Sequence, residues 1–102
     1  MIARIWHGWT LPENADQYEQ LLRAHILPGI HRVSGYEGAQ LLRGKRDNRV
    51  EFVTITYFRS MEDVKAFAGE DYRKAVIAPE AKHLLLEYDE YSAHYELLDK
   101  TS

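Results

Sequence analysis

Hydrophobic and polar residues alternate along four stretches of this chain, at residues 2–9, 36–45, 49–58 and 88–98. Alternation of this kind is typical of β-strands, whose successive side chains point to opposite faces of a sheet. The first stretch puts Ile5, His7 and Trp9 on one face and Arg4 and Trp6 on the other. We expect the face that carries His7 to look toward the helices.

The first long gap between these strands shows helical spacing. Apolar residues recur every three or four positions from Ala15 to Ile26. Two competing capping boxes, which begin at Thr10 and at Asn14, mark the start of this helix. Pro28 should kink or end it.

The second long gap also predicts helical structure. It opens with a capping box from Ser60 to Asp63, and Gly69 should end a short helix there. Residues 71–77 could add another turn or two. Pro79 then opens a further helical piece through Leu85.

The resulting order, β-α-β-β-α-β, predicts a single α+β domain over residues 1–102 with a ferredoxin-like fold. Its helices should cover one face of a four-stranded antiparallel sheet, and no third layer is left for the other face. The third strand is apolar or β-branched on both sides, with Phe52 and Phe58 on one side and Val53, Ile55 and Tyr57 on the other. A solvated sheet face would show a polar side, so we expect a homodimer formed through the sheet faces.

Composition narrows the class of protein. The 102 residues carry a net charge of −3 with both signs interspersed, which argues against a nucleic-acid or membrane surface. Cysteine is absent, so disulfides and thiolate chemistry are excluded. The N-terminus does not look like a signal peptide, and no segment approaches the roughly 20 apolar residues of a membrane span. We therefore expect a cytoplasmic protein.

Three motifs suggest a family. They are Val33-Ser34-Gly35-Tyr36-Glu37-Gly38 before the second strand, Tyr57-Phe58-Arg59-Ser60-Met61-Glu62-Asp63 between the third strand and the second helix, and His94-Tyr95-Glu96 in the last strand. Together with the short first strand and the acidic first helix, they make the chain similar to the antibiotic biosynthesis monooxygenase family of the dimeric α+β barrel superfamily. The resemblance extends over nearly the whole chain.

This resemblance implies a cofactor-independent monooxygenase that acts on a small aromatic or quinol substrate. A second interpretation is a non-catalytic or stress-associated dimer that binds a small ligand. A third is haem binding or degradation. Haem-degrading members carry Asn, Trp and His at positions that match His7, Phe67 and Ile77 here, so all three identities differ.

His7 is the leading catalytic candidate, because a free imidazole titrates near ~6.5 and could take a proton from a phenol or hydroquinone. The alternative is a hydrogen-bonded histidine in a core or an interface. Tyr57 and Tyr72 could donate hydrogen bonds to a substrate oxygen, or pack half-buried. The remaining candidates should line the cleft between helices and sheet: Trp9, Tyr18, Leu22, His25 and Phe67.

Sequence motifs for a cofactor or a metal do not appear. The five histidines show no metal-ligand spacing, and there is no Gly-rich phosphate loop or dinucleotide fingerprint. We therefore expect neither a cofactor nor a bound metal.

Overall fold

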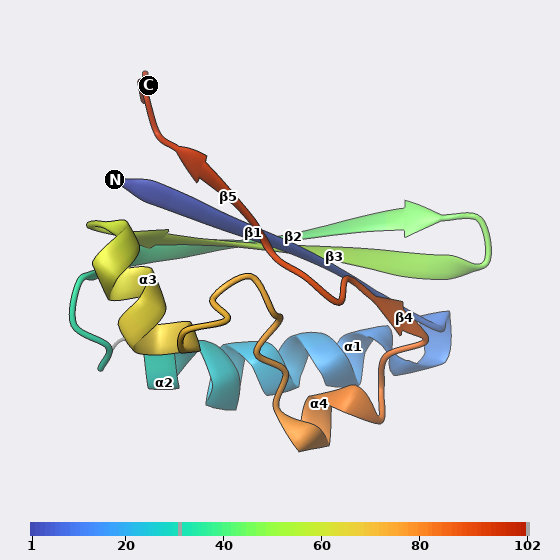
Figure 1. The fold of residues 1–102 in the computed structure, drawn as a ribbon. Helices are drawn as coiled ribbons and strands as arrows, with labels where there is room; N and C mark the ends of the chain where they lie inside the picture. The colour runs from blue at the N-terminus through green and yellow to red at the C-terminus, as the bar shows by residue number, and fades with distance from the viewer. Residues whose placement is uncertain (31, 102) are drawn as a thin grey trace.

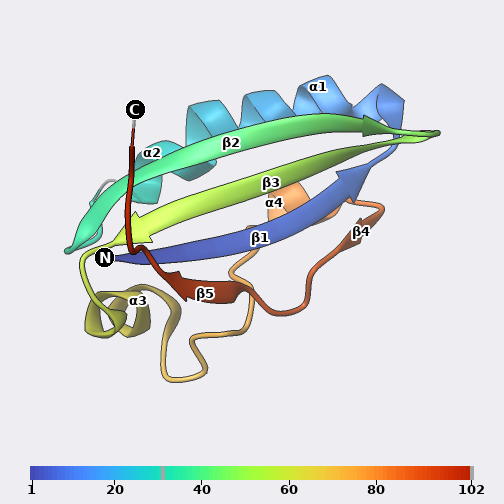
Figure 2. The same cartoon turned by 90° about the horizontal axis from the view of Figure 1, so that it is seen from above.

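The computed structural model describes residues 1–30 and 32–101. Five strands within these residues form one antiparallel sheet (Figure 1): β1 (Ile2–Thr10), β2 (Tyr36–Arg46), β3 (Arg49–Phe58), β4 (Glu87–Tyr88) and β5 (Ala93–Glu96). The order is β2-β3-β1, and both β4 and β5 pair with the other edge of β1 (Figure 2). This order, with helices in the two crossovers, confirms the predicted ferredoxin-like α+β fold.

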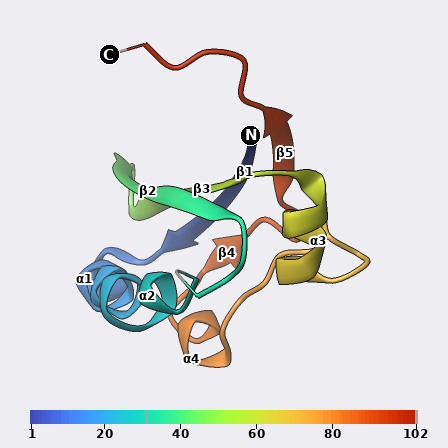
Figure 3. The ribbon, with the colours of Figure 1, turned by 90° about the vertical axis from the view of Figure 1, so that its left-hand side faces the viewer.

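The helical segments are α1 (Pro12–Leu21), the π-helix η1 (Leu22–Ile26), α2 (Leu27–Ile30), α3 (Met61–Ala68) and α4 (Pro79–Lys82). Three of them, α1, α2 and α4, lie beneath one face of the sheet, and α3 packs at one end of that face (Figure 1, Figure 3). No described element covers the opposite face, and the segment after β5 leads away on that side (Figure 3). The second sheet face is therefore uncovered within one chain, as predicted.

The last strand is broken, because its middle bonds to another segment. The pattern predicted one strand over residues 88–98, but residues 89–92 separate β4 from β5. There the Ala75 N–H donates to the Glu90 carbonyl at 3.0 Å, and the Ser92 N–H donates to the Arg73 carbonyl at 2.6 Å. These bonds fasten the segment of residues 69–78, which follows α3, beside the sheet edge.

Pro28 distorts the first helix rather than ending it. It lacks an N–H, and its ring would clash with the carbonyl four residues earlier in a regular α-helix. The chain widens into the π-helix η1, in which the Leu27 N–H donates to the Leu22 carbonyl, and it then continues through α2. The predicted capping boxes are wrong, since α1 begins at Pro12 without a side-chain cap.

The start of α3 confirms its predicted cap. The Asp63 N–H donates to Ser60 Oγ at 3.4 Å, and Gly69, with a φ of 92°, ends the helix. Of the one or two turns expected over residues 71–77, one forms, closed by the bond from the Lys74 N–H to the Asp71 carbonyl at 3.1 Å. The main chain beyond it bonds to residues 90–92 instead. For α4 the predicted end at Leu85 is too late, since the helix stops at Lys82.

The two faces of β1 are the reverse of the prediction. Trp6 packs against the core beneath the sheet, and the Arg4 guanidinium lies over the ring of Phe67 in α3. Because successive strand residues point to opposite faces, His7 and Trp9 point to the uncovered face. The expectation that His7 looks toward the helices is therefore wrong.

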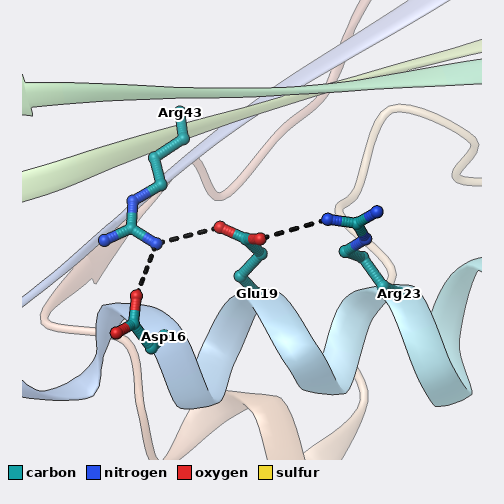
Figure 4. A network of polar contacts seen from close by, with 4 residues as sticks. All are labelled: Asp16, Glu19, Arg23 and Arg43. Carbon is teal, nitrogen blue, oxygen red and sulfur yellow. Dashed lines mark hydrogen bonds and ion pairs between the residues drawn. The ribbon is translucent and has the colours of Figure 1, made fainter.

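An ion-pair network fastens α1 and η1 to β2 (Figure 4). Arg43 Nη1 donates to Asp16 Oδ1 at 2.8 Å and to Glu19 Oε1 at 2.9 Å, while Arg23 Nη1 donates to Glu19 Oε2 at 3.3 Å. The hydrogen bond from Arg43 lowers the pKa of Glu19, and the hydrogen bond to Asp16 raises the pKa of Arg43. Because solvent reaches these side chains, the network positions the helix more than it stabilises the fold.

Candidate functional site

A cavity that opens to solvent lies between the sheet and the helices. Three aromatic side chains form much of its wall, and aliphatic residues of η1, α2 and the segment before α4 form most of the rest. The lining residues are Arg4, Trp6, Tyr18, Leu22, Ile26, Leu27, Ile30, Thr54, Thr56, Phe67, Val76, Ile77, Ala78, Ala81 and Ser92. A mostly apolar concavity with a few polar groups is typical of a small-molecule site.

Trp6 is held in place within this wall. Its indole Nε1 donates to the main-chain carbonyl of Asp89 at 2.8 Å. Gly8 makes room for the ring, because a Cβ at that position would lie 2.6 Å from the Trp6 atom Cη2. The glycine therefore allows the indole to lie close to its own strand.

Arg4 brings a positive charge to the cavity, although only 5% of the residue is exposed. Its Nη1 donates to the Tyr72 carbonyl, and its Nη2 donates to the Lys74 carbonyl at 3.2 Å. The guanidinium carbon lies 5.6 Å from the centre of the Phe67 ring. Arg4 thus joins β1, α3 and the segment of residues 69–78 at one point.

His94 of β5 is the third partner of Arg4. Arg4 Nη1 lies 2.9 Å from His94 Nε2, and since a guanidinium can only donate, Nε2 is the acceptor and the ring proton is on Nδ1. Burial, together with the charge of Arg4, lowers the pKa of His94. Burial also lowers the pKa of Arg4. His94 is therefore neutral at pH 7 and orients the guanidinium.

Three of the predicted lining residues do line the cavity: Tyr18, Leu22 and Phe67. They lie on the helix faces that the apolar spacing directs toward the sheet. Tyr18 is almost fully buried against Phe52, with 4.8 Å between the ring centres. Burial raises the pKa of its hydroxyl, so Tyr18 stays protonated at physiological pH and is not a base.

Tyr72 and His25 lie outside the lining. The Tyr72 carbonyl accepts from Arg4, and its ring packs edge-on against His94 with 5.3 Å between the ring centres. Tyr72 thus contacts the Arg4 guanidinium and His94 and does not line the cavity. His25 is exposed on η1, so the expectation that it lines the cleft is wrong.

His7, Trp9 and Tyr57 lie on the uncovered face, away from the cavity. His7 Nδ1 is 2.7 Å from Asp89 Oδ2, and the imidazole stacks on Trp9 with 6.2 Å between ring centres. The Tyr57 hydroxyl donates to Gln40 Oε1 at 2.7 Å. The structure therefore does not bring the predicted base and its predicted lining residues together in one cleft.

Arg4, Trp6 and His94 were missed by sequence reasoning as site residues. Alternation shows which residues of β1 share a face, but not which face the helices cover. Gly8 was the available signal, because a glycine inside a strand often marks the close approach of another group. A glycine two residues from a tryptophan on the same face predicts that the ring lies there.

The cavity does not suit a haem held by a protein axial ligand. Its described lining residues include no histidine, cysteine or methionine, and the Tyr18 hydroxyl stays protonated. Over residues 1–30 and 32–101, no three His, Asp or Glu side chains come close enough together to hold a metal ion. In the same residues no helix is both long enough and apolar enough to span a membrane.

The sequence profile of the antibiotic biosynthesis monooxygenase family matches residues 1–79. The chain belongs to this family. This membership confirms the resemblance seen in the sequence motifs. Comparison of the sequence with curated proteins gives no match.

Several solved structures share the fold over nearly the whole chain. The monooxygenase ActVA-Orf6 of Streptomyces coelicolor, in complex with nanaomycin D, has a TM-score of 0.74 at 13% identity, with 99% of this chain and 90% of that chain covered. SnoaB, a cofactor-independent oxygenase of Streptomyces nogalater, has a TM-score of 0.60 at 16% identity, with 97% and 95% covered. MhuD, a haem degrader of Mycobacterium tuberculosis with two haems bound, has a TM-score of 0.65 at 18% identity, with both chains covered 100%. At these identities the likeness establishes the fold alone.

Proposed function

We propose that this protein is a monooxygenase that acts without a cofactor on a small aromatic or quinol substrate in the cavity between sheet and helices. The observation that carries the proposal is the wall of three aromatic rings, Trp6, Tyr18 and Phe67, around a mostly apolar space. A planar aromatic substrate gains both apolar contact and favourable ring geometry there. The fold shared with SnoaB and ActVA-Orf6 supports the same class of reaction.

The proposed reaction needs no external reductant. The substrate loses a proton, and its electron-rich anion transfers an electron to dioxygen. The two radicals combine to a peroxide on the ring carbon, which then loses water. One oxygen atom stays on that carbon as a carbonyl and the other leaves as water, so the substrate supplies every electron that dioxygen takes up.

The cavity residues have positioning roles in this scheme. Trp6 and Phe67 hold the ring system, and Arg4 supplies the positive charge among the described lining residues. Among the described lining residues there is no carboxylate and no imidazole, so the proton leaves to water at the open mouth. His7 is not assigned as the base, because its imidazole lies on the other face of the sheet.

A non-catalytic dimer that binds a small aromatic ligand is the second candidate. The aromatic cavity suits this candidate equally well. A second observation favours it, because the described lining residues contain no group that takes up a proton readily at neutral pH. The two candidates share the cavity and its ligand class. They differ only in whether bound substrate reacts with dioxygen.

We propose further that two copies pair through their uncovered sheet faces. The strand register places Leu42 beside Val53 and Ile5 beside Ile55 on that face. Leu42 is 48% exposed and Tyr95 is 57% exposed in the single chain. Covering a sheet face of this kind requires an interface of the obligate class, on the order of 2,000 Å² or more.

The reaction is tested with an anthrone and isotopically labelled dioxygen. We expect a quinone that carries one labelled oxygen atom, formed faster than in buffer alone. Phe67→Ala, which removes one aromatic wall, should lower turnover per folded molecule, while His25→Ala on the exposed side of η1 should not. Binding without turnover across hydroquinones, anthrones and naphthols would establish the non-catalytic candidate instead.

A further inference from the structure

Arg4 is an almost fully buried cation that has no opposing carboxylate among the described residues. The ion pairs of the described residues all involve side chains other than Arg4. No carboxylate oxygen of these residues lies within 4.0 Å of the Arg4 guanidinium nitrogens. The other described residues that line the cavity bring no charge. Its neighbour His94 is neutral, as argued above. A buried guanidinium is normally paired, because enclosing an unpaired charge is costly.

The hydrogen bonds of Arg4 leave part of its donor capacity free. Arg4 donates to two main-chain carbonyls and to one imidazole nitrogen. A guanidinium has five N–H groups, so two are not used by these bonds, and no nitrogen of Arg4 is both fully buried and unpaired. Carbonyl and imidazole dipoles orient the group but do not neutralise its charge. An anionic oxygen is the chemical partner that this arrangement lacks.

We propose that the cavity selects aromatic ligands that carry an anionic oxygen on the ring system, with that oxygen bound to Arg4. The aromatic part contacts Trp6 and Phe67, and the hydroxyl-bearing Ser92 and Thr54 also line the space. This inference rests on the proposed function and narrows its substrate class. It also supplies a step that the cavity otherwise lacks: Arg4 stabilises the ionised form of a phenol or enol, so no side-chain base is required.

Arg4 also has a structural role, because its bonds to the Tyr72 and Lys74 carbonyls hold the segment of residues 69–78. That role alone does not predict any preference among ligands of one shape. A test must therefore compare two ligands that differ in charge and not in size. It must also report folding separately from binding.

The ligand pair is 2-naphthoate and 2-naphthamide, which share the ring system and have nearly the same outline. The affinity of each ligand is measured by titration calorimetry at pH 7. We expect the wild-type protein to bind 2-naphthoate about 10- to 100-fold more tightly, the difference typical of a charge-assisted hydrogen bond. Equal affinities, or tighter binding of the amide, would overturn this inference and leave the aromatic cavity of the proposed function standing. Failure of both ligands to bind would overturn both proposals.

The variants are Arg4→Gln, Arg4→Lys and Arg59→Gln, each checked by its melting curve. Arg4→Gln should lose the preference for 2-naphthoate over 2-naphthamide, whereas Arg4→Lys should keep part of it. Arg59 is a matched control, because its side chain is 72% exposed and its loss changes the net charge equally. A preference that persists in Arg4→Gln would overturn the inference. If Arg4→Gln does not fold, Arg59→Gln still tests the inference. Loss of the preference for 2-naphthoate in Arg59→Gln would overturn it.

Discussion

The imidazole of His7 and the carboxylate of Asp89 lie 2.7 Å apart on the uncovered face of the sheet. The same carboxylate accepts the His7 main-chain N–H at 3.0 Å, and the Asp89 N–H donates to the His7 carbonyl at 2.8 Å. Asp89 therefore continues the pairing of β1 in the gap between β4 and β5. These contacts match the alternative that the sequence left open for His7, a hydrogen-bonded histidine with a structural role.

His7→Ala is expected to leave turnover per folded molecule unchanged. It should lower the free energy of unfolding by only about 0.2–1 kcal/mol, because the imidazole and the Asp89 carboxylate are both about one third exposed and the carboxylate keeps the main-chain N–H of residue 7. Urea denaturation and an oxygenase assay on the same preparation check both values, with His25→Ala as the exposed-histidine control. A rate loss of about 10²-fold or more at unchanged stability would instead identify His7 as a general base.

Protonation of His94 should lower the free energy of unfolding in mildly acidic solution. Burial and the charge of Arg4 lower the pKa of His94 in the folded protein, so below about 6.5 the unfolded chain binds more protons than the folded one. The stability that neutral His94 contributes is present above that pH and is lost as the pH falls toward the folded-state pKa. His94→Gln keeps an acceptor for Arg4 and does not titrate in this range. Urea denaturation across this pH range should give a flatter curve for the variant, and an unchanged curve would assign the effect to another group.

Gly8→Ala should close part of the cavity. The new methyl would lie 2.6 Å from the Trp6 ring, so the indole must shift. We expect a loss of about 1–3 kcal/mol in the free energy of unfolding and weaker binding of 2-naphthamide. Gly29→Ala is the control, because a Cβ there meets nothing within 4 Å. Normal binding by Gly8→Ala would show that the Trp6 position is not needed for the site.

Thr10→Val should raise stability. The hydroxyl of Thr10 is buried at the end of β1 and has no hydrogen-bond partner among the described residues. Replacing it with a methyl group of similar size removes an unsatisfied polar group, which is worth about 1 kcal/mol or more. A thermal melt compared with wild type measures the change. A lower melting temperature would mean that the hydroxyl has a partner in solution.

Ile55→Lys should convert the proposed dimer to a monomer. The substitution places a charge in the middle of the uncovered face, where pairing would bury it without a partner. Sedimentation velocity at micromolar concentration distinguishes the two states, and Ala24→Lys at an exposed position of η1 serves as the control. A wild-type protein that sediments as a stable monomer would refute the dimer.

Most of the fold follows from local patterns. Alternation predicts β1, β2 and β3 because the two sides of each strand meet different surroundings along its length. The start of α3 is predictable because the Ser60 side chain itself accepts the Asp63 N–H. The break between β4 and β5 is different in kind. It depends on main-chain bonds from Ala75 and Ser92 to residues about 15 to 20 positions away, for which no side-chain pattern exists.

The site was predictable where a helix carries it. Tyr18, Leu22 and Phe67 were placed correctly as lining residues because an amphipathic helix has one apolar side, and that side faces the sheet. A strand with large side chains on both faces offers no such rule, so His7 was assigned to the wrong face. The buried charge of Arg4 was the least predictable feature, since arginine is usually exposed.

Asp89 touches both sides of the sheet: its carbonyl accepts the Trp6 indole in the cavity wall, and its carboxylate accepts His7 on the face proposed to meet a second subunit. A ligand bound against the indole therefore lies one side chain away from the residue that orders the other face. If two subunits pair there, any factor by which ligand changes the subunit dissociation constant must equal the factor by which pairing changes the ligand affinity.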